Sequence, residues 1–413
     1  PELARPAALL PPRPAGVHAG RLDRVRAALP ALLARGVAAD DAAAASIAYL
    51  MGAGVVSGYS DADGVSTGMF GPDDLLTREQ VAKLINAEPN EIVFTSGATE
   101  SNNLAIIGSA KFRANHGKHL ITMTTEHKAV SGPFDYLEKE GFEVTRLRPG
   151  TDGLLDTKQL KKAIREDTQL VSIMHINNEI GAIQNIFEIA SVCEDQGVLF
   201  HCDAAQSVGK ISIDLKKLPI DLLSISAHKF YGPQGIGALF IREAHKVKLL
   251  PITHGGEQEM WVRPGTLPLH QIIGFGVAAK LAMTRMREDL ILMEDLSNHF
   301  FEKIRNLPDI FLNGSDKNRY PGIVNIRAPG VNGESLLLLL EPLCVAQGSA
   351  CNSKNSEPSH VLRELGLNDH EIQSSIRFSF TRDTTRDDVD FALEKYISAV
   401  NQLRKNYPSN INE

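Results

Sequence analysis

The chain has few cysteines, one tryptophan and no long apolar run, and these shortages exclude several classes of protein. Four cysteines, at positions 193, 202, 344 and 351, are too few for a disulfide-stapled fold and lack the CxxC spacing of a zinc or redox site. No apolar run approaches the roughly 20 residues of a membrane span, and the start lacks the charged-then-apolar order of a signal peptide. We therefore expect a cytoplasmic protein with no metal centre and no membrane partner.

The chain also has no excess of basic over acidic residues. The 43 Lys and Arg residues are outnumbered by 50 Asp and Glu residues, giving a net charge of -7. Direct nucleic-acid binding is therefore not expected. The length of 413 residues is enough for two or three domains.

The first 70 residues or so differ in composition from the rest. They are rich in Ala, Arg and Pro, and the first lysine of the chain is Lys83. Residues 1–38 are predicted to form a poorly ordered or appended tail, because prolines remove backbone donors and the apolar residues follow no period. Residues 39–88 are predicted to be a helical segment, with Thr77 as a helix N-cap. Its GVVSGYSD and FGPDDLLTREQ stretches weakly resemble one surface-layer-homology repeat.

Two domains are predicted beyond this segment. Over 89–270, short β-branched runs such as EIVFT, HLITM and VLFHCDA alternate with helical periods. This alternation predicts an α/β fold, with a mostly parallel sheet covered by helices on both faces. Over 271–413, a long helical pattern precedes strands such as GIVNIRA and SIRFSF, which predicts a smaller α+β domain.

Polar residues follow several of the predicted strands. His228 and Lys229 come directly after the strand LLSIS, in the kind of turn where parallel sheets present their chemistry. The turn SGAT, with Ala98 and Thr99, opens a helix whose free amides suit an anion. It lacks the spacing of a Walker loop, which favours a small phosphate-bearing cofactor over a nucleoside triphosphate.

Other strand ends carry groups suited to an aromatic cofactor. Asp203 and Gln206 follow VLFHC, His127 follows HLITMTTE, and Asn178 follows LVSIMHIN. A buried carboxylate needs a cationic partner, and a protonated pyridine nitrogen is one. A phosphate turn, a flat imidazole, this carboxylate and Lys229 for an imine together describe a pyridoxal-phosphate site.

From about residue 78 to 405, the sequence resembles a cysteine desulfurase of the fold-type I pyridoxal-phosphate enzymes, in the subgroup with a long catalytic loop. The matching motifs are FTSGATESNNLAI, TEHKAV, NNEIGAIQ, HCDAAQSVGK, SISAHKFYGPQGIGAL, RPGT, GSACNS followed by EPSHVLRELG, and SSIRFSFTR.

The resemblance implies pyridoxal 5'-phosphate as cofactor and L-cysteine as substrate. It implies that Lys229 bonds covalently to the cofactor, that His127 stacks on its ring, and that Asp203 pairs with its ring nitrogen. The other implied cofactor contacts are Ala98, Thr99, Asn178, Gln206, Ser226, His228 and Thr266, the last from the second subunit of a homodimer.

The loop QGSACNSKNSEPS indicates how sulfur would leave the substrate. Cys351 lies among small polar residues, whereas Cys193 and Cys202 fall in helix and strand patterns that predict burial. By the resemblance, Arg377 and Asn178 bind the substrate, and Cys351 takes its sulfur as a persulfide while alanine is released. A sulfur-acceptor protein would follow, either a scaffold for iron–sulfur cluster assembly or an enzyme of nucleic-acid thiolation or phosphorothioation.

Two departures from the family pattern keep alternatives open. The amino-terminal LDxxATTP and GNPSSxH motifs are not found, and Glu257 stands where the family usually has glycine. The alternatives are a selenocysteine lyase and a catalytically impaired binding protein that keeps the pyridoxal-phosphate fold.

Overall fold

The computed structural model describes residues 72–243, 246–305, 307–347 and 358–406. The predicted tail, most of the predicted 39–88 segment and Cys351 lie outside these residues. The predicted domain boundaries therefore stay predictions.

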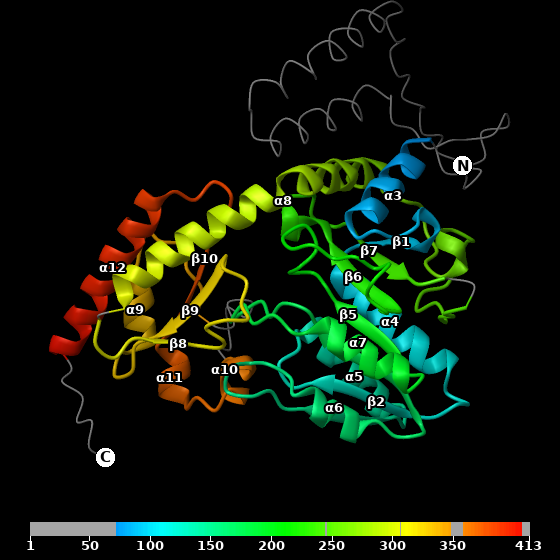
Figure 1. Ribbon diagram of the computed structural model, residues 1–413, viewed down its shortest axis with the longest axis horizontal. Helices are drawn as coiled ribbons and strands as arrows, with labels where there is room; N and C mark the ends of the chain where they lie inside the picture. Colours follow the sequence, from blue (N-terminus) through cyan, green and yellow to red (C-terminus); the bar gives the residue numbers. More distant parts are fainter. Residues whose placement is uncertain (1–71, 244–245, 306, 348–357, 407–413) are drawn as a thin grey trace, which may run out of the picture. The chain divides into compact units, whose positions relative to one another are not determined.

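A seven-stranded sheet forms the centre of the larger part (Figure 1). Its strand order is β1-β7-β6-β5-β4-β2-β3, and only β7 runs antiparallel to its neighbours. The predicted fold class is confirmed, because the other six strands are parallel. The strands are β1 (Ile92–Thr95), β2 (His119–Met123), β3 (Glu143–Leu147), β4 (Thr168–Met174), β5 (Leu199–Asp203), β6 (Leu222–Ser226) and β7 (Gly237–Ile241).

Helices cover both faces of this sheet because its strands are apolar on both sides. Alternate strand residues such as Phe94 and Ile225 belong to one hydrophobic core, and their neighbours such as Val93 belong to others. The first core includes residues of α3 (Pro72–Leu84), α6 (Thr157–Ala163), α7 (Ile186–Asp195) and α8 (Leu269–Ile304). The opposite face packs against α4 (Ala98–Phe112) and α5 (Lys128–Lys139).

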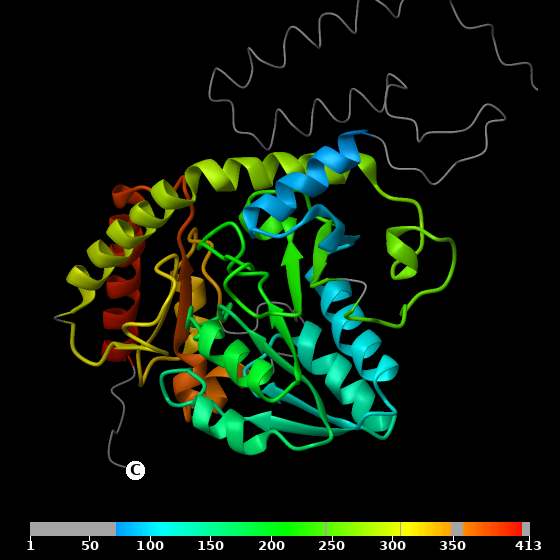
Figure 2. The same cartoon turned by 45° about the vertical axis from the view of Figure 1, so that its right-hand side comes forward.

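The long helix α8 joins this part to a smaller antiparallel sheet (Figure 2). Its first half contributes Phe275 to the core of the seven-stranded sheet, and its second half contributes Phe300 to a separate core. The smaller sheet has the order β10-β9-β8. The elements of this part are β8 (Phe311–Leu312), β9 (Ile323–Arg327), α9 (Gly333–Leu339), α10 (His360–Glu364), α11 (Asp369–Gln373), β10 (Ser375–Ser379) and α12 (Arg386–Asn406).

Helix α3 begins earlier than the sequence predicts. The sequence predicts Thr77 as an N-cap, but the helix already begins at Pro72, so Thr77 lies inside it. Thr77 instead lies buried against α8 at Gly276, where an added Cβ would come within 2.8 Å of the threonine methyl group. Close helix packing at this glycine therefore holds α3 on the sheet.

A buried ion pair also holds α3 in place. Arg78 donates from Nη1 and Nη2 to the two carboxylate oxygens of Glu259, at 2.9 and 2.7 Å, and Glu259 also accepts the Phe94 N–H at 2.6 Å. Glu259 lies in the short helix η3 (Glu259–Trp261) and is 1% exposed. The sequence pattern points to the exposed Glu257, two residues away, and gives no sign of the buried role of Glu259.

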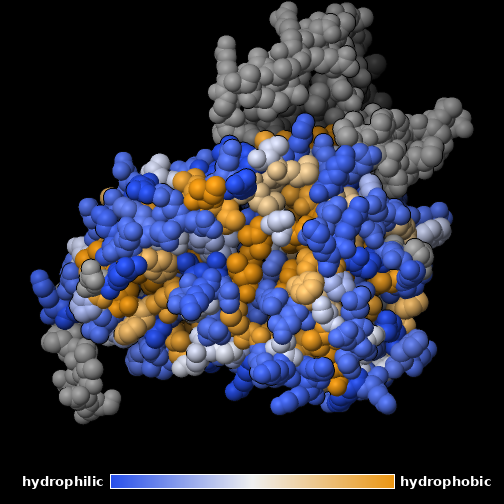
Figure 3. All heavy atoms as spheres, viewed as in Figure 1, coloured by the Kyte–Doolittle hydropathy of each residue, from blue (hydrophilic) through white to orange (hydrophobic). Residues whose placement is uncertain are grey.

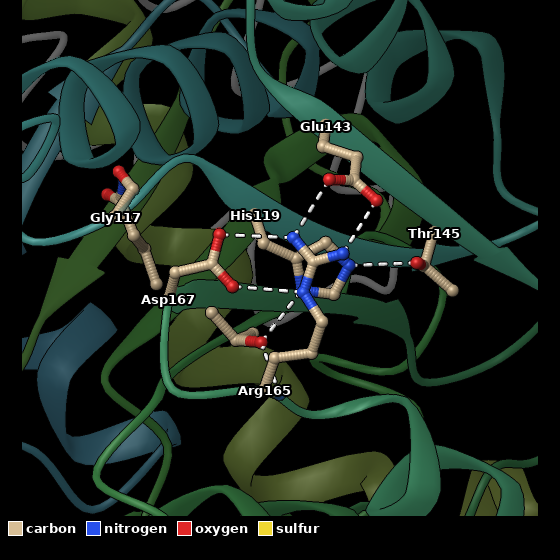
Figure 4. A network of polar contacts seen from close by, with 8 residues as sticks. Gly117, His119, Glu143, Thr145, Arg165 and Asp167 are labelled. Atoms are coloured by element: carbon tan, nitrogen blue, oxygen red, sulfur yellow. Dashed lines mark hydrogen bonds and ion pairs between the residues drawn. The ribbon is translucent and has the colours of Figure 1, made fainter.

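The amino ends of β2, β3 and β4 are tied by a polar network (Figure 4). Arg165 forms ion pairs with Glu143 and Asp167, and the buried His119 ring contacts Thr168 at 2.7 Å and Thr145 at 2.8 Å. This cluster lies at the sheet edge opposite the strand carboxyl ends, so its role is to hold neighbouring strands together.

His201 makes the fold sensitive to acid. It is fully buried in β5 between Ser172 (2.7 Å) and Ser224 (2.9 Å), and burial lowers its pKa to about 3. Below pH 6.5 the unfolded chain binds a proton that folded His201 excludes, so we expect stability to fall as pH falls towards 3, by up to about 1.4 kcal/mol per pH unit for this group.

Urea unfolding between pH 8 and 4 measures this loss. His201→Gln should give a shallower pH dependence than the parent, whereas replacing the exposed His116 by Gln should not. Equal slopes for His201→Gln and the parent would contradict the assignment.

In the part of the chain that the structure describes, no helix is long and apolar enough to cross a membrane. Figure 3 shows hydrophilic side chains spread over the visible face, with hydrophobic residues between them.

Candidate functional site

A cavity of about 610 Å³ opens at the carboxyl ends of the parallel strands, where α/β proteins place their sites. Residues of the smaller part complete its wall. Thr266 does not line this cavity and is exposed, and Cys351 lies outside the described residues. The sequence-predicted residues that line it are Ala98, Thr99, His127, Asn178, Asp203, Gln206, Ser226, His228, Lys229 and Arg377.

The turn between β1 and α4 forms one end of the cavity. Gly97 has a φ of 144°, and the Gly237 backbone approaches it so closely that a Cβ on Gly237 would lie 2.6 Å from the Gly97 Cα. The first backbone bond of α4 runs from the Ser101 N–H to the Gly97 carbonyl. The amides of Ala98 and Thr99 therefore have no partner within the helix and can bind an anion.

Glu100, the acidic residue in the first turn of α4, is already paired. Arg263 donates to Glu100 at 2.8 Å, and the Ser96 N–H donates to the same carboxylate at 2.5 Å. Burial would raise the pKa of Glu100, but these two hydrogen bonds hold it below its usual value. Its negative charge is thus balanced by Arg263, which lowers the repulsion that an anion at the turn would meet.

Lys229 lies in the short helix η2 (Ala227–Phe230), directly after β6. The hydroxyl of Ser226 lies 3.0 Å from Nδ1 of His228. Phe230 packs over Gly209, where a Cβ would come within 2.6 Å of its ring. This contact brings the turn after β5 against the turn that carries Lys229.

Asp203 ends β5 and is 6% exposed. Its carboxylate accepts the Ala205 N–H at 2.9 Å and the side-chain amide of Asn102 at 2.8 Å. Burial raises the pKa of Asp203, and no described Lys, Arg or His lies within ion-pair distance of it. A cationic group bound in the cavity would therefore be stabilised by this carboxylate. Sequence reasoning missed Asn102, which one turn of α4 places beneath the anion-binding amides.

His127 is fixed by its own helix. It is the N-cap of α5, and its Nδ1 accepts the Ala129 N–H at 3.0 Å. The neutral ring then carries its proton on Nε2. Burial lowers the pKa of His127, which favours this neutral form.

Arg377 reaches the cavity from β10. Its Nη1 donates to the Asn178 carbonyl at 2.9 Å, while its buried Nε has no partner among the described residues. Its backbone forms an antiparallel bridge with Ala346, a few residues before the loop that contains Cys351. A guanidinium held at one nitrogen, with further donors free, is suited to bind a carboxylate.

A second arginine, not predicted from the sequence, contacts two residues of the cavity wall, Tyr231 and Asp289. Arg382 pairs with Asp289 at 3.0 Å, and its guanidinium lies 3.7 Å from the centroid of the Tyr231 ring. The Arg382 N–H donates to the Tyr231 hydroxyl at 3.0 Å. Tyr231 has a φ of 69°, so these contacts hold a strained residue next to the Lys229 turn.

The described cysteines separate into buried and exposed thiols. Cys193 and Cys202 are buried, as predicted, and burial raises the pKa of Cys193 to about 12 and that of Cys202 well above its usual value. Cys344 is exposed. Neither buried thiol can readily supply a thiolate.

The cavity fits pyridoxal phosphate. The α4 amides suit its phosphate, the carboxylate of Asp203, which has no ion-pair partner among the described residues, suits its ring nitrogen, and Lys229 lines the same cavity. A carboxylate buried without a cation is costly, and a protonated pyridine nitrogen would provide that cation.

Comparisons with known proteins agree with this geometry. A family model described as Aminotransferase class-V matches residues 75–391, and one described as S-layer homology domain matches residues 37–82. The cysteine desulfurase IscS of Colwellia psychrerythraea is 51% identical over 333 residues, covering 81% of this chain and 82% of the relative.

Two solved structures are also similar. DndA from Streptomyces lividans has a TM-score of 0.71 and 36% identity, covering 82% of this chain and 96% of that one. SspA in complex with cysteine has a TM-score of 0.68 and 37% identity, covering 79% of this chain and 93% of that one. The chain therefore belongs to the aminotransferase class-V family and, within it, to the pyridoxal-phosphate-dependent cysteine desulfurases.

Proposed function

We propose that this chain converts L-cysteine to L-alanine and passes the sulfur, through a persulfide on Cys351, to an acceptor protein. The observation that carries the proposal is the single cavity in which Lys229, Asp203, His127 and Arg377 meet. Bound pyridoxal phosphate would supply the electron sink for cleavage of the carbon–sulfur bond.

Each residue has a task that its geometry supports. Arg377 binds the substrate carboxylate through its free donors, and Lys229 moves a proton at the substrate α-carbon. With the cofactor bound, Asp203 would hold a proton on the ring nitrogen, and Gln206 and Asn178 would contact the ring oxygen. His127 would stack on the ring, with its Nε2–H available as a donor.

The remaining contacts hold the phosphate. Thr99, Ser226 and His228, which line the cavity, would bind it within one subunit, together with the Ala98 amide. Thr266, which is exposed and outside the cavity, would bind it from the second subunit of a homodimer.

The Cys351 thiolate attacks the substrate sulfur, a sulfur–sulfur bond forms, and the carbon–sulfur bond breaks with its electron pair left on the substrate carbon. That carbon then takes up a proton and becomes the methyl group of alanine. The persulfide passes to an acceptor of iron–sulfur cluster assembly or of nucleic-acid thiolation or phosphorothioation.

Incubation of the purified protein with L-cysteine and a thiol reductant tests this function. We expect alanine and sulfide in equal amounts, and light scattering should give the mass of a dimer. Alanine from selenocysteine but not from cysteine would favour a selenocysteine lyase. No alanine from either substrate, with cofactor bound, would indicate an impaired enzyme.

Asp203→Ala should weaken cofactor binding and lower alanine production by about 10²-fold, because a charge-assisted hydrogen bond to the ring nitrogen is lost. Titration of the apoprotein with pyridoxal phosphate and the alanine assay measure the two effects. Asp214→Ala, which removes a partly exposed carboxylate that does not line the cavity, is the control. Parent-like turnover in Asp203→Ala would remove the residue from its proposed role.

A further inference from the structure

Lys210 lines the same cavity, but the proposed reaction gives it no role. It follows Gln206 by four residues in a helical turn, because the Ser207 and Val208 amides both donate to the Ala204 carbonyl and the Lys210 amide donates to the Ser207 carbonyl. Residues four apart in such a turn lie on one face. The close contact of Gly209 with Phe230 brings this turn against the one that carries Lys229.

The ammonium group of Lys210 contacts the side-chain amide of Gln206. Its Nζ lies 2.6 Å from Oε1 of Gln206, and 5.3 Å from the centroid of the Tyr320 ring. In the described part of the chain, no carboxylate lies within ion-pair distance of Nζ, and the charges that act on it most are those of Lys229 and Arg377. Burial and these two charges lower the pKa of Lys210 to about 7.

This contact decides which end of the Gln206 amide faces the cofactor site. The N–H bonds of Nζ donate to Oε1 of Gln206 whether the lysine is charged or neutral, so the amide oxygen faces Lys210. The Nε2 group of Gln206 has no partner among the described residues and remains available on the cavity side. That group is a donor, which is what an ionised ring oxygen requires.

We infer that Lys210 is a positioning residue, which holds Gln206 so that its NH₂ group donates to the ring oxygen of the bound cofactor. The inference rests on the proposed role of Gln206 in the cofactor site. A hydrogen bond donated to the ring oxygen would make that oxygen a weaker acceptor for the proton on the nitrogen that links Lys229 to the cofactor. The pKa of that nitrogen would therefore be lower.

The visible absorbance of the bound cofactor, titrated with pH, measures this effect without turnover. Lys210→Met should raise the midpoint by about one pH unit, as expected for losing one hydrogen bond to a charged group. Gln206→Leu should raise it similarly. The double variant should shift no further than either single variant, because Lys210 acts through Gln206. Lys210→Arg, which keeps a charged donor, should stay near the parent midpoint.

Two outcomes would overturn the inference. One is an unchanged midpoint in Lys210→Met with cofactor bound. The other is a Lys210→Met shift that is as large in the Gln206→Leu background as in the parent, which would show that Lys210 acts by its charge alone. If Lys210→Met fails to fold, Gln206→Leu is compared with Lys210→Arg, which is measured in the parent and in the Gln206→Leu background. A Gln206→Leu midpoint equal to that of the parent contradicts the inference. A parent protein that binds no cofactor would instead refute the proposed function.

Discussion

Lys229→Ala is expected to abolish covalent attachment of pyridoxal phosphate and to lower turnover of L-cysteine at least about 10³-fold. The variant lacks both the amine that bonds to the cofactor and the group that moves the substrate proton. Visible absorbance reports the attachment. Mass spectrometry after borohydride reduction should find the added mass on the parent peptide that contains Lys229.

The control is Lys217→Ala, because the Lys217 side chain is 82% exposed and pairs only with Asp214 in the described structure. The more demanding comparison is Lys210, a second lysine in the same cavity. If the added mass were found on Lys210, or if Lys229→Ala kept the parent absorbance, Lys229 would lose its proposed role.

Cys351→Ser should bind the cofactor and respond spectrally to L-cysteine like the parent, yet produce neither persulfide nor alanine above background. The two tasks lie on different residues, so removal of the nucleophile leaves binding intact. Cys193 and Cys202 are poor replacements for Cys351 as the nucleophile, because burial holds their thiols in the protonated form. Cys344 is the one exposed thiol among the described residues.

Cys344→Ser is therefore the matched control, and it should retain activity. Alkylation after a single turnover, followed by peptide mass spectrometry, locates the persulfide sulfur. Persulfide on Cys344, or full alanine production by Cys351→Ser, would move the nucleophile to another residue.

The local sequence is enough to predict the strands, the turns that follow them and most of the candidate residues that line the cavity. Apolar runs of five or so residues mark buried strands, and a polar residue just after such a run must lie at a strand end. Lys229, Asp203 and the Gly97 turn were found this way, because each depends only on its immediate neighbours along the chain. Parallel pairing then brings these ends to one edge of the sheet.

Other features were decided only by the tertiary structure. Asn102 meets Asp203, Arg78 meets Glu259, and Arg382 meets Tyr231, each across more than 100 residues of sequence. No local pattern identifies such partners, because a hydrogen bond or ion pair depends on distances that packing sets.

The first residue of α3 also could not be predicted from the local sequence. The Thr77 pattern fits a helix cap, yet contact with α8 buries that residue inside α3. Lys210 depends on both the local sequence and the tertiary structure. Its spacing from Gln206 is visible in the sequence, but the charge around it, and hence its inferred role, arises where Lys229 and Arg377 converge on the same cavity from separate parts of the fold.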